Sequence, residues 1–221
     1  MKWAWLLAAM PALVLSAPAQ VANSNGPVIQ VEFSNPDLSP SHWTLIIHPD
    51  GNGHFQSERN TAPAARAQGI DVPSVNRDVQ LSAEFAGRVF QMAQTHKFFQ
   101  IECESHMKVA FQGMKQLSYR GPDGTGSCQF NFSRDKEIQA LGESLVAVAE
   151  TIVEGARLET LLQHDPLGLD HETEYLVEAA GDGRVQQIGA IRGILERLAD
   201  DDAVMERVRK RARMLLARSD G

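Results

Sequence analysis

The sequence predicts an α+β fold, in which an antiparallel sheet of hairpins is covered by two helices and followed by a small all-helical segment. Two observations indicate this order. Aromatic residues and prolines gather before residue 133, among short alternating apolar runs separated by turn residues. Beyond Phe132, Tyr175 is the only aromatic residue and Pro166 the only proline, and apolar residues recur at helical spacing.

The β-rich part contains short segments in which apolar side chains alternate with polar ones or cluster as in buried strands. These segments are 28–33, 43–48, 54–58, 79–81, 98–102, 108–111, 114–119 and 127–132. Turn residues at 49–53 (PDGNG) and at 121–126 (GPDGTG) predict two hairpins, because glycine supplies positive φ and proline pre-sets the turn. Residues 59–77 lack periodicity and predict a loop.

Two longer helices are expected to cover the sheet, at 82–95 and 135–163. Three shorter helices follow, at 171–180, 185–199 and 200–217, and their short links predict antiparallel neighbours. We therefore expect a leader over 1–19, an α+β domain over 20–163 and a helical segment over 164–221.

The first nineteen residues have the order of an export signal. Lys2 provides a positive start, residues 3–15 are almost wholly apolar, and small residues follow. Ala17 and Ala19 fit the cleavage rule, so the mature chain is expected to begin at Gln20. A buried N-terminal helix is the alternative, whereas the apolar run is shorter than the about 20 residues that span a bilayer. The signal predicts a secreted or periplasmic product.

The amino-acid composition limits which classes of molecule this protein is expected to bind. The chain has 221 residues with 28 acidic and 21 basic side chains, which give a formal net charge of −7. This acidic balance argues against non-specific nucleic-acid binding. No later segment is long and apolar enough to predict a transmembrane helix in the mature chain.

The two cysteines, Cys103 and Cys128, are expected to form a disulfide, because an exported protein matures under oxidising conditions. A reactive thiol is the alternative, since Glu102, Glu104 and His106 surround Cys103. The chain has no Cys-x-x-Cys motif, and an even pair in an exported chain is usually structural.

The C-terminal segment contains IRGILERLADDD at 191–202, followed by Val204, Val208-Arg209, Ala212 and Leu215-Leu216. This pattern resembles a HEAT-type helical repeat, which pairs an aliphatic helix with an acidic turn and a second helix with Val-Arg and Ala-x-x-Leu positions. The resemblance implies a protein-binding surface. An ordinary amphipathic helical hairpin is the alternative, because a stable array needs at least about three repeats.

One group of residues suggests a metal site. His48 and His54 flank the first turn and, with Asp50, offer imidazole and carboxylate ligands. Their spacing matches no established metal motif, and the turn alone explains the residues 48–51.

Two functions are consistent with these patterns. The first is a non-catalytic exported binding or protein-interaction module, without a cofactor, whose partner is another exported or envelope protein. The loop 59–77 and the C-terminal helices are its expected contact surfaces. The alternative is a metal-dependent exported enzyme that uses His48, Asp50 and His54.

The leader generates a first prediction. Intact-mass and N-terminal analysis of the exported protein should give a chain that starts at Gln20, because small residues precede that bond. Native material that is retained in the cytosol with its leader uncut would contradict the export signal.

Overall fold

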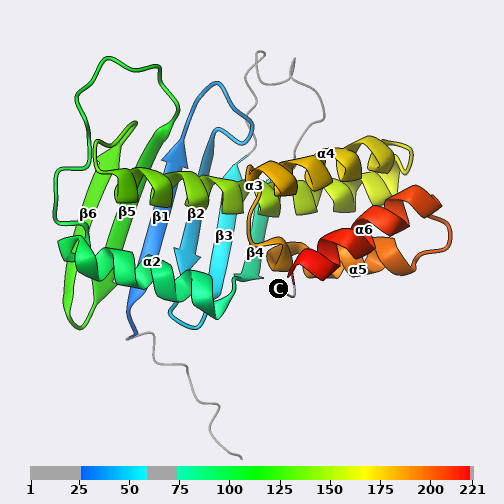
Figure 1. Ribbon diagram of the computed structural model, residues 1–221, viewed down its shortest axis with the longest axis horizontal. Coiled ribbons are helices and arrows are strands. Elements are labelled where there is room, and N and C mark those ends of the chain that lie inside the picture. The colour runs from blue at the N-terminus through cyan, green and yellow to red at the C-terminus, as the bar shows by residue number, and fades with distance from the viewer. Residues whose placement is uncertain (1–25, 59–73, 220–221) are drawn as a thin grey trace, which may run out of the picture.

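The computed structural model describes residues 26–58 and 74–219, which form a layered α+β structure with a helical end (Figure 1). The predicted cleavage site and residues 59–73 of the predicted loop lie outside the described residues. The predicted fold class is confirmed, since a six-stranded antiparallel sheet carries helices on one face.

The sheet has the strand order β4-β3-β2-β1-β5-β6, and every neighbouring pair is antiparallel. The strands are β1 (Val28–Ser34), β2 (His42–Ile47), β3 (Asn52–Glu58), β4 (Val75–Gln80), β5 (Met114–Gly121) and β6 (Gly124–Phe130). The β2–β3 and β5–β6 hairpins are the two that the turn residues predict. The predicted strand at 79–81 starts earlier, at Val75, and forms the β4 edge.

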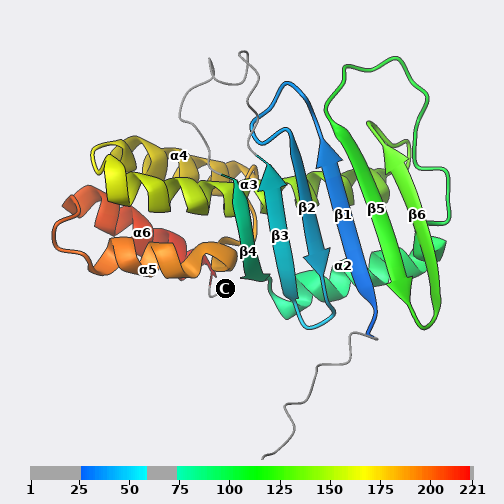
Figure 2. The same cartoon turned by 180° about the vertical axis from the view of Figure 1, so that it is seen from behind.

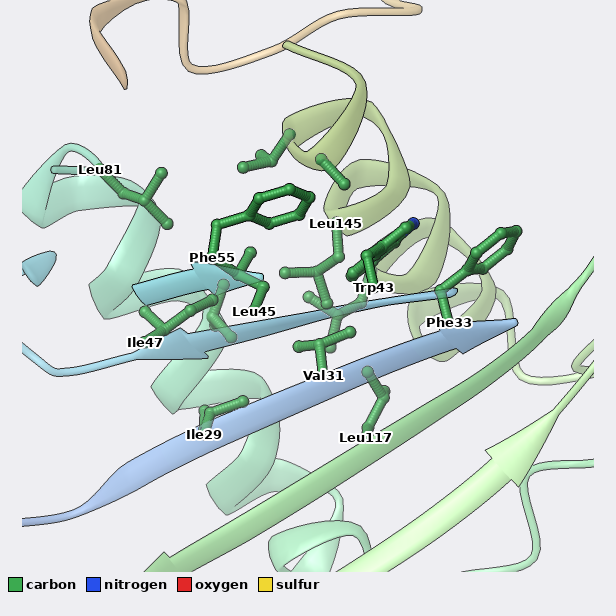
Figure 3. Packing of buried hydrophobic residues seen from close by; sticks show 14 of the residues in the cluster. Ile29, Val31, Phe33, Trp43, Leu45, Ile47, Phe55, Leu81, Leu117 and Leu145 are labelled. Atoms are coloured by element: carbon green, nitrogen blue, oxygen red, sulfur yellow. The ribbon is translucent and has the colours of Figure 1, made fainter. Parts of the chain in front are cut away.

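Strand alternation places one apolar face of the sheet under two helices, α2 (Ala83–Thr95) and α3 (Lys136–His164). Val31 of β1 lies opposite Leu45 of β2 and Leu117 of β5, and all three are buried. Figure 3 shows Leu145 of α3 among these strand residues. Burial of this face is the main stabilising contribution, because each large side chain removed from water contributes about 1.5–3 kcal/mol.

The opposite face of the sheet carries no helix (Figure 2). Polar side chains line it in register across the strands, and one row from β3 to β6 contains Gln56, Thr44, Glu32, Gln116 and Gln129. An antiparallel sheet tolerates such a face because amides and hydroxyls hydrogen-bond with water.

Beyond the β4 edge, the chain builds a helical end from α4 (Gly168–Asp182), a 3₁₀ turn η2 (Ile188–Ile191), α5 (Arg192–Asp200) and α6 (Glu206–Ser219). These elements share a second apolar core with the C-terminal part of α3. Gly155 allows η2 to approach α3, because a Cβ at this position would lie 2.3 Å from Ile191. The change of core lies within α3, between Ala156 and Leu158.

The segment between α2 and β5 differs from its prediction. Strands were expected at 98–102 and 108–111, but Lys97, Phe98 and Phe99 have φ values of 54–65° and form a left-handed turn, η1 (Lys97–Phe99). This turn buries Phe99 and stacks Phe98 on Tyr119 with ring centroids 4.7 Å apart. The aromatic packing offsets a conformation that costs L-residues about 1–2 kcal/mol each. Residues 100–113 contain no strand.

Helix boundaries in the C-terminal part are also shifted. Asp200 ends α5 and the next helix begins at Glu206, so the acidic run 200–202 lies at the turn rather than inside the last helix. Within the described residues, no helix is both long and apolar enough to cross a membrane.

The disulfide prediction is confirmed: Cys103 and Cys128 are bonded, with their Cα atoms 5.7 Å apart. The bond joins the segment after η1 to the β6 edge strand.

Replacing both cysteines by serine (Cys103→Ser with Cys128→Ser) should lower the free energy of unfolding by about 3 kcal/mol, because the loop is no longer closed in the unfolded chain. Urea denaturation of the oxidised protein and the variant measures the difference. Equal stability of the two would contradict a structural role for the bond.

Candidate functional site

The structure separates the residues of the predicted metal site. Asp50 lies in the β2–β3 turn, where its carboxylate accepts bonds from the backbone N–H of Asn52 (3.0 Å) and the Asn52 side chain (2.6 Å). These bonds hold the pKa of Asp50 below its ordinary value. His54 points to the open face, with Nδ1 2.8 Å from Oδ1 of Asp78 on β4. His48, Asp50 and His54 do not form a group of ligand atoms within 4.8 Å of one another.

A different group of side chains of the types that bind metal ions lies where α2 ends and α3 begins. Across the described ranges, His96, Asp135 and Glu137 are the one set of three such residues with ligand atoms within 4.8 Å. His96 presents Nδ1 to Asp135 (3.5 Å) and Nε2 to Glu137 (3.0 Å). Oδ1 of Asp135 also accepts the N–H groups of Glu137 and Ile138 as the helix cap. The group therefore pairs the two helices, and its three ligand types could also hold a cation.

The residues around Cys103 hold the local backbone in place through the disulfide and through hydrogen bonds to Glu104. Cys103 is in the disulfide and has no free thiol. The carboxylate of Glu104 accepts N–H bonds from Asn131 (2.7 Å), Ser105 (2.8 Å) and His106 (3.2 Å). These bonds, led by that from Asn131, hold the pKa of Glu104 below its ordinary value. Glu104 thus ties the segment before β5 to the chain that follows β6.

The chain that follows Glu104 forms an exposed apolar segment, residues 106–111, which we term the apolar tip. All six residues are exposed, and the exposed fractions of Met107, Val109 and Phe111 are 51%, 37% and 52%. The tip is anchored at both ends. Before it, the N–H of Ser105 donates to the carbonyl of Phe132 (2.9 Å); after it, the N–H of Gln112 donates to the Asn131 side chain (2.7 Å).

Exposed apolar side chains concentrate at this end of the sheet. The large hydrophobic residues exposed in the described part of the chain are Leu38, Met107, Val109, Phe111, Leu167 and Met214. Leu38 lies in the β1–β2 connection, and Ser34 at the end of β1 pairs with Met114 at the start of β5. The connection and the tip therefore leave the sheet at the same end, as Figure 1 shows. Four of these six residues therefore lie at the same end of the sheet.

Sequence reasoning missed the apolar tip. Its alternation of apolar residues with His106, Lys108 and Ala110 is typical of a half-buried strand, and a strand was predicted at 108–111. Periodicity shows which residues share a face, but it does not show whether a neighbouring element covers that face. The polar residues that anchor the tip, Glu104 and Asn131, carry no sequence signal of this role.

A buried acidic cluster lies between α3 and α4. Glu154 and Glu172 are buried, and both lie near Nη1 of Arg157, at 3.1 Å and 3.4 Å. Nearby, the hydroxyl of Tyr175 donates to Glu150 at 3.3 Å. Burial, reinforced by the hydrogen bond with Glu172, raises the pKa of Glu154 to about 9. The pair therefore retains a proton at neutral pH.

The chain matches no protein-family model, and no match was found for it among the curated proteins.

The acidic cluster generates a prediction about pH. Because the pKa of Glu154 is about 9 in the folded protein against an ordinary 4.5, the folded state binds the extra proton between these values. Stability should fall as the pH rises through this window, with a slope of at most about 1.4 kcal/mol per pH unit. Glu154→Gln should flatten that dependence, as measured by urea denaturation from pH 5 to about 9.

Glu178→Gln is the matched control, because Glu178 is exposed on α4 and is outside the acidic cluster. It should keep the pH slope of the unchanged protein. Parallel stability curves for the unchanged protein and Glu154→Gln would show that Glu154 does not retain the proton.

Proposed function

We propose that this protein is a non-catalytic exported binding protein that holds another exported or envelope protein through the apolar tip. The supporting observation is the exposure of Met107, Val109 and Phe111 within one anchored segment. Exposed apolar side chains grouped in this way are typical of interaction sites, whereas single ones are ordinary.

The anchoring favours binding on energetic grounds. A flexible loop loses conformational entropy when it is ordered by a partner, and this cost reduces affinity. Here the disulfide at Cys103 and the Glu104 bonds restrain one side of the tip, while Asn131 holds the other. Asn131 also donates from its side chain to the carbonyl of Ala110 within the tip (3.1 Å). The apolar side chains are thus presented on a restrained backbone.

Export is part of the proposal. The leader at 1–19 and the disulfide both support maturation in a secreted or periplasmic location. The resemblance of the 191–216 segment to a HEAT-type repeat supports a second contact surface on α5 and α6.

The alternative of a metal-dependent enzyme at His48, Asp50 and His54 stays a prediction. Nδ1 of His54 already contacts Oδ1 of Asp78 at 2.8 Å.

Replacing two tip side chains, Met107→Ser with Phe111→Ser, should weaken partner binding about 100-fold, since each lost apolar contact contributes about 1.5 kcal/mol. The immobilised protein is used to capture partners from the native envelope fraction, and the affinity of the recovered partner is then measured for both forms. The free energy of unfolding should change by no more than about 0.5 kcal/mol, because both side chains are exposed.

Leu167→Ser is the matched control, since this exposed apolar residue precedes α4 and lies outside both the tip and the helices α5 and α6. It should bind the partner as the unchanged protein does. Unaltered binding by the tip variant would refute the tip as the contact surface.

A further inference from the structure

A hollow of about 330 Å³ lies beside α3, and no residue of the tip is among its lining residues. Val146 and Ala147 of α3 provide apolar wall, and Gln112 and Lys115 line the side toward β5. The turn after α4 closes one end with Asp182 and Arg184, which pair with each other at 2.9 Å. Glu143 of α3 also lines the hollow. The volume lies at the lower end of the range for small-ligand sites, which is about 300–1,000 Å³.

The side chain of Lys115 is unusual for a lysine. It is only 4% exposed, because strand alternation places it on the core side of β5, where Nζ lies 5.5 Å from the ring centroid of Phe130. Nζ donates to the carbonyl oxygens of Gly113 and Asn131, each at 3.0 Å.

The hydrogen bonds that Lys115 makes with the described residues use two of the donors of its ammonium group. A lysine ammonium carries three N–H donors. Within the described ranges, the hydrogen-bond acceptors of Lys115 are two neutral carbonyls, and Lys115 forms no ion pair with a carboxylate. Burial lowers the pKa of Lys115, while the charges of Glu143 and Glu104 oppose that shift. Buried charges are normally paired, so the remaining donor calls for an acceptor.

Glu143 supplies the opposite charge at the same hollow. Its carboxylate accepts from the side chain of Gln139 at 2.7 Å and does not contact Lys115. Besides the Asp182–Arg184 pair, the hollow therefore has one cation and one anion on its walls that do not form an ion pair with each other, beside an apolar surface. A ligand with a single charge would be attracted by either Lys115 or Glu143 and would leave the other without a charge of opposite sign.

We propose that this hollow binds a small apolar α-amino acid as its zwitterion. The carboxylate of the ligand accepts the third N–H of Lys115, its ammonium group faces Glu143, and its side chain contacts Val146 and Ala147. This site is separate from the proposed partner surface, and neither proposal depends on the other.

The test uses the full mature protein and three ligands of matched shape. Leucine carries both charges, isocaproate lacks the amino group, and isoamylamine lacks the carboxylate. Isothermal titration calorimetry should show leucine binding at least about tenfold more tightly than either analogue, since a hydrogen bond to a charged group contributes about that factor. Equal binding of leucine and isocaproate would overturn the zwitterion, and no binding of leucine would overturn the site.

Two variants separate the roles of the wall charges. Lys115→Met should weaken leucine binding at least about tenfold, because the carboxylate loses its charged donor. Glu143→Gln should bring the affinities for leucine and isocaproate together, because the ammonium group loses its counter-charge. Glu143 is exposed, so this variant tests the proposal even if Lys115→Met fails to fold.

Glu178→Gln is again the matched control and should bind leucine as the unchanged protein does. Unaltered discrimination between leucine and isocaproate in Glu143→Gln would refute the assigned orientation. Because the tip is unaltered in these variants, partner capture by them is expected to persist, and failure of one proposal is distinguishable from failure of the other.

Discussion

The need to cover the apolar face of the sheet governs how the other elements are arranged. Six strands leave this face on one side, and α2 and α3 must cover it to keep it from water. Helix α3 has 29 residues and extends past the β4 edge, where Arg77 of β4 forms two hydrogen bonds with Glu159. The extended part of α3 then supplies one wall of the second core. One helix thus determines where the helical end lies.

The edge of the sheet at β6 is covered by the chain that follows η1. An open strand edge invites pairing with other chains. Here the chain from η1 to Ser105 runs beside β6, held by the disulfide and by the bond from Ser105 to the Phe132 carbonyl. The same restraint that covers this edge also directs residues 106–111 outward. The exposed apolar tip is therefore a consequence of how the sheet ends, and binding by the tip would use a segment that is already ordered.

Ionisable groups in the interior have two different environments. Glu154 and Glu172 share the guanidinium of Arg157 between two helices, so burial favours a retained proton. Lys115 has neutral carbonyl partners and is one of the residues that line a hollow. The first arrangement is closed and affects stability. The second lines a hollow, and for this reason we propose a binding role for it.

Alternation and helical spacing are local patterns, so the sequence was sufficient to predict the α+β class, both hairpins, the two covering helices and the Cys103–Cys128 pair. It did not determine the left-handed turn at η1 or the exposure of Met107, Val109 and Phe111. Neither the Lys115 hollow nor the Glu154–Glu172 pair could be predicted, because their members are distant in the chain. These features follow from the three-dimensional packing of the chain, because burial and pairing depend on which segments meet in space.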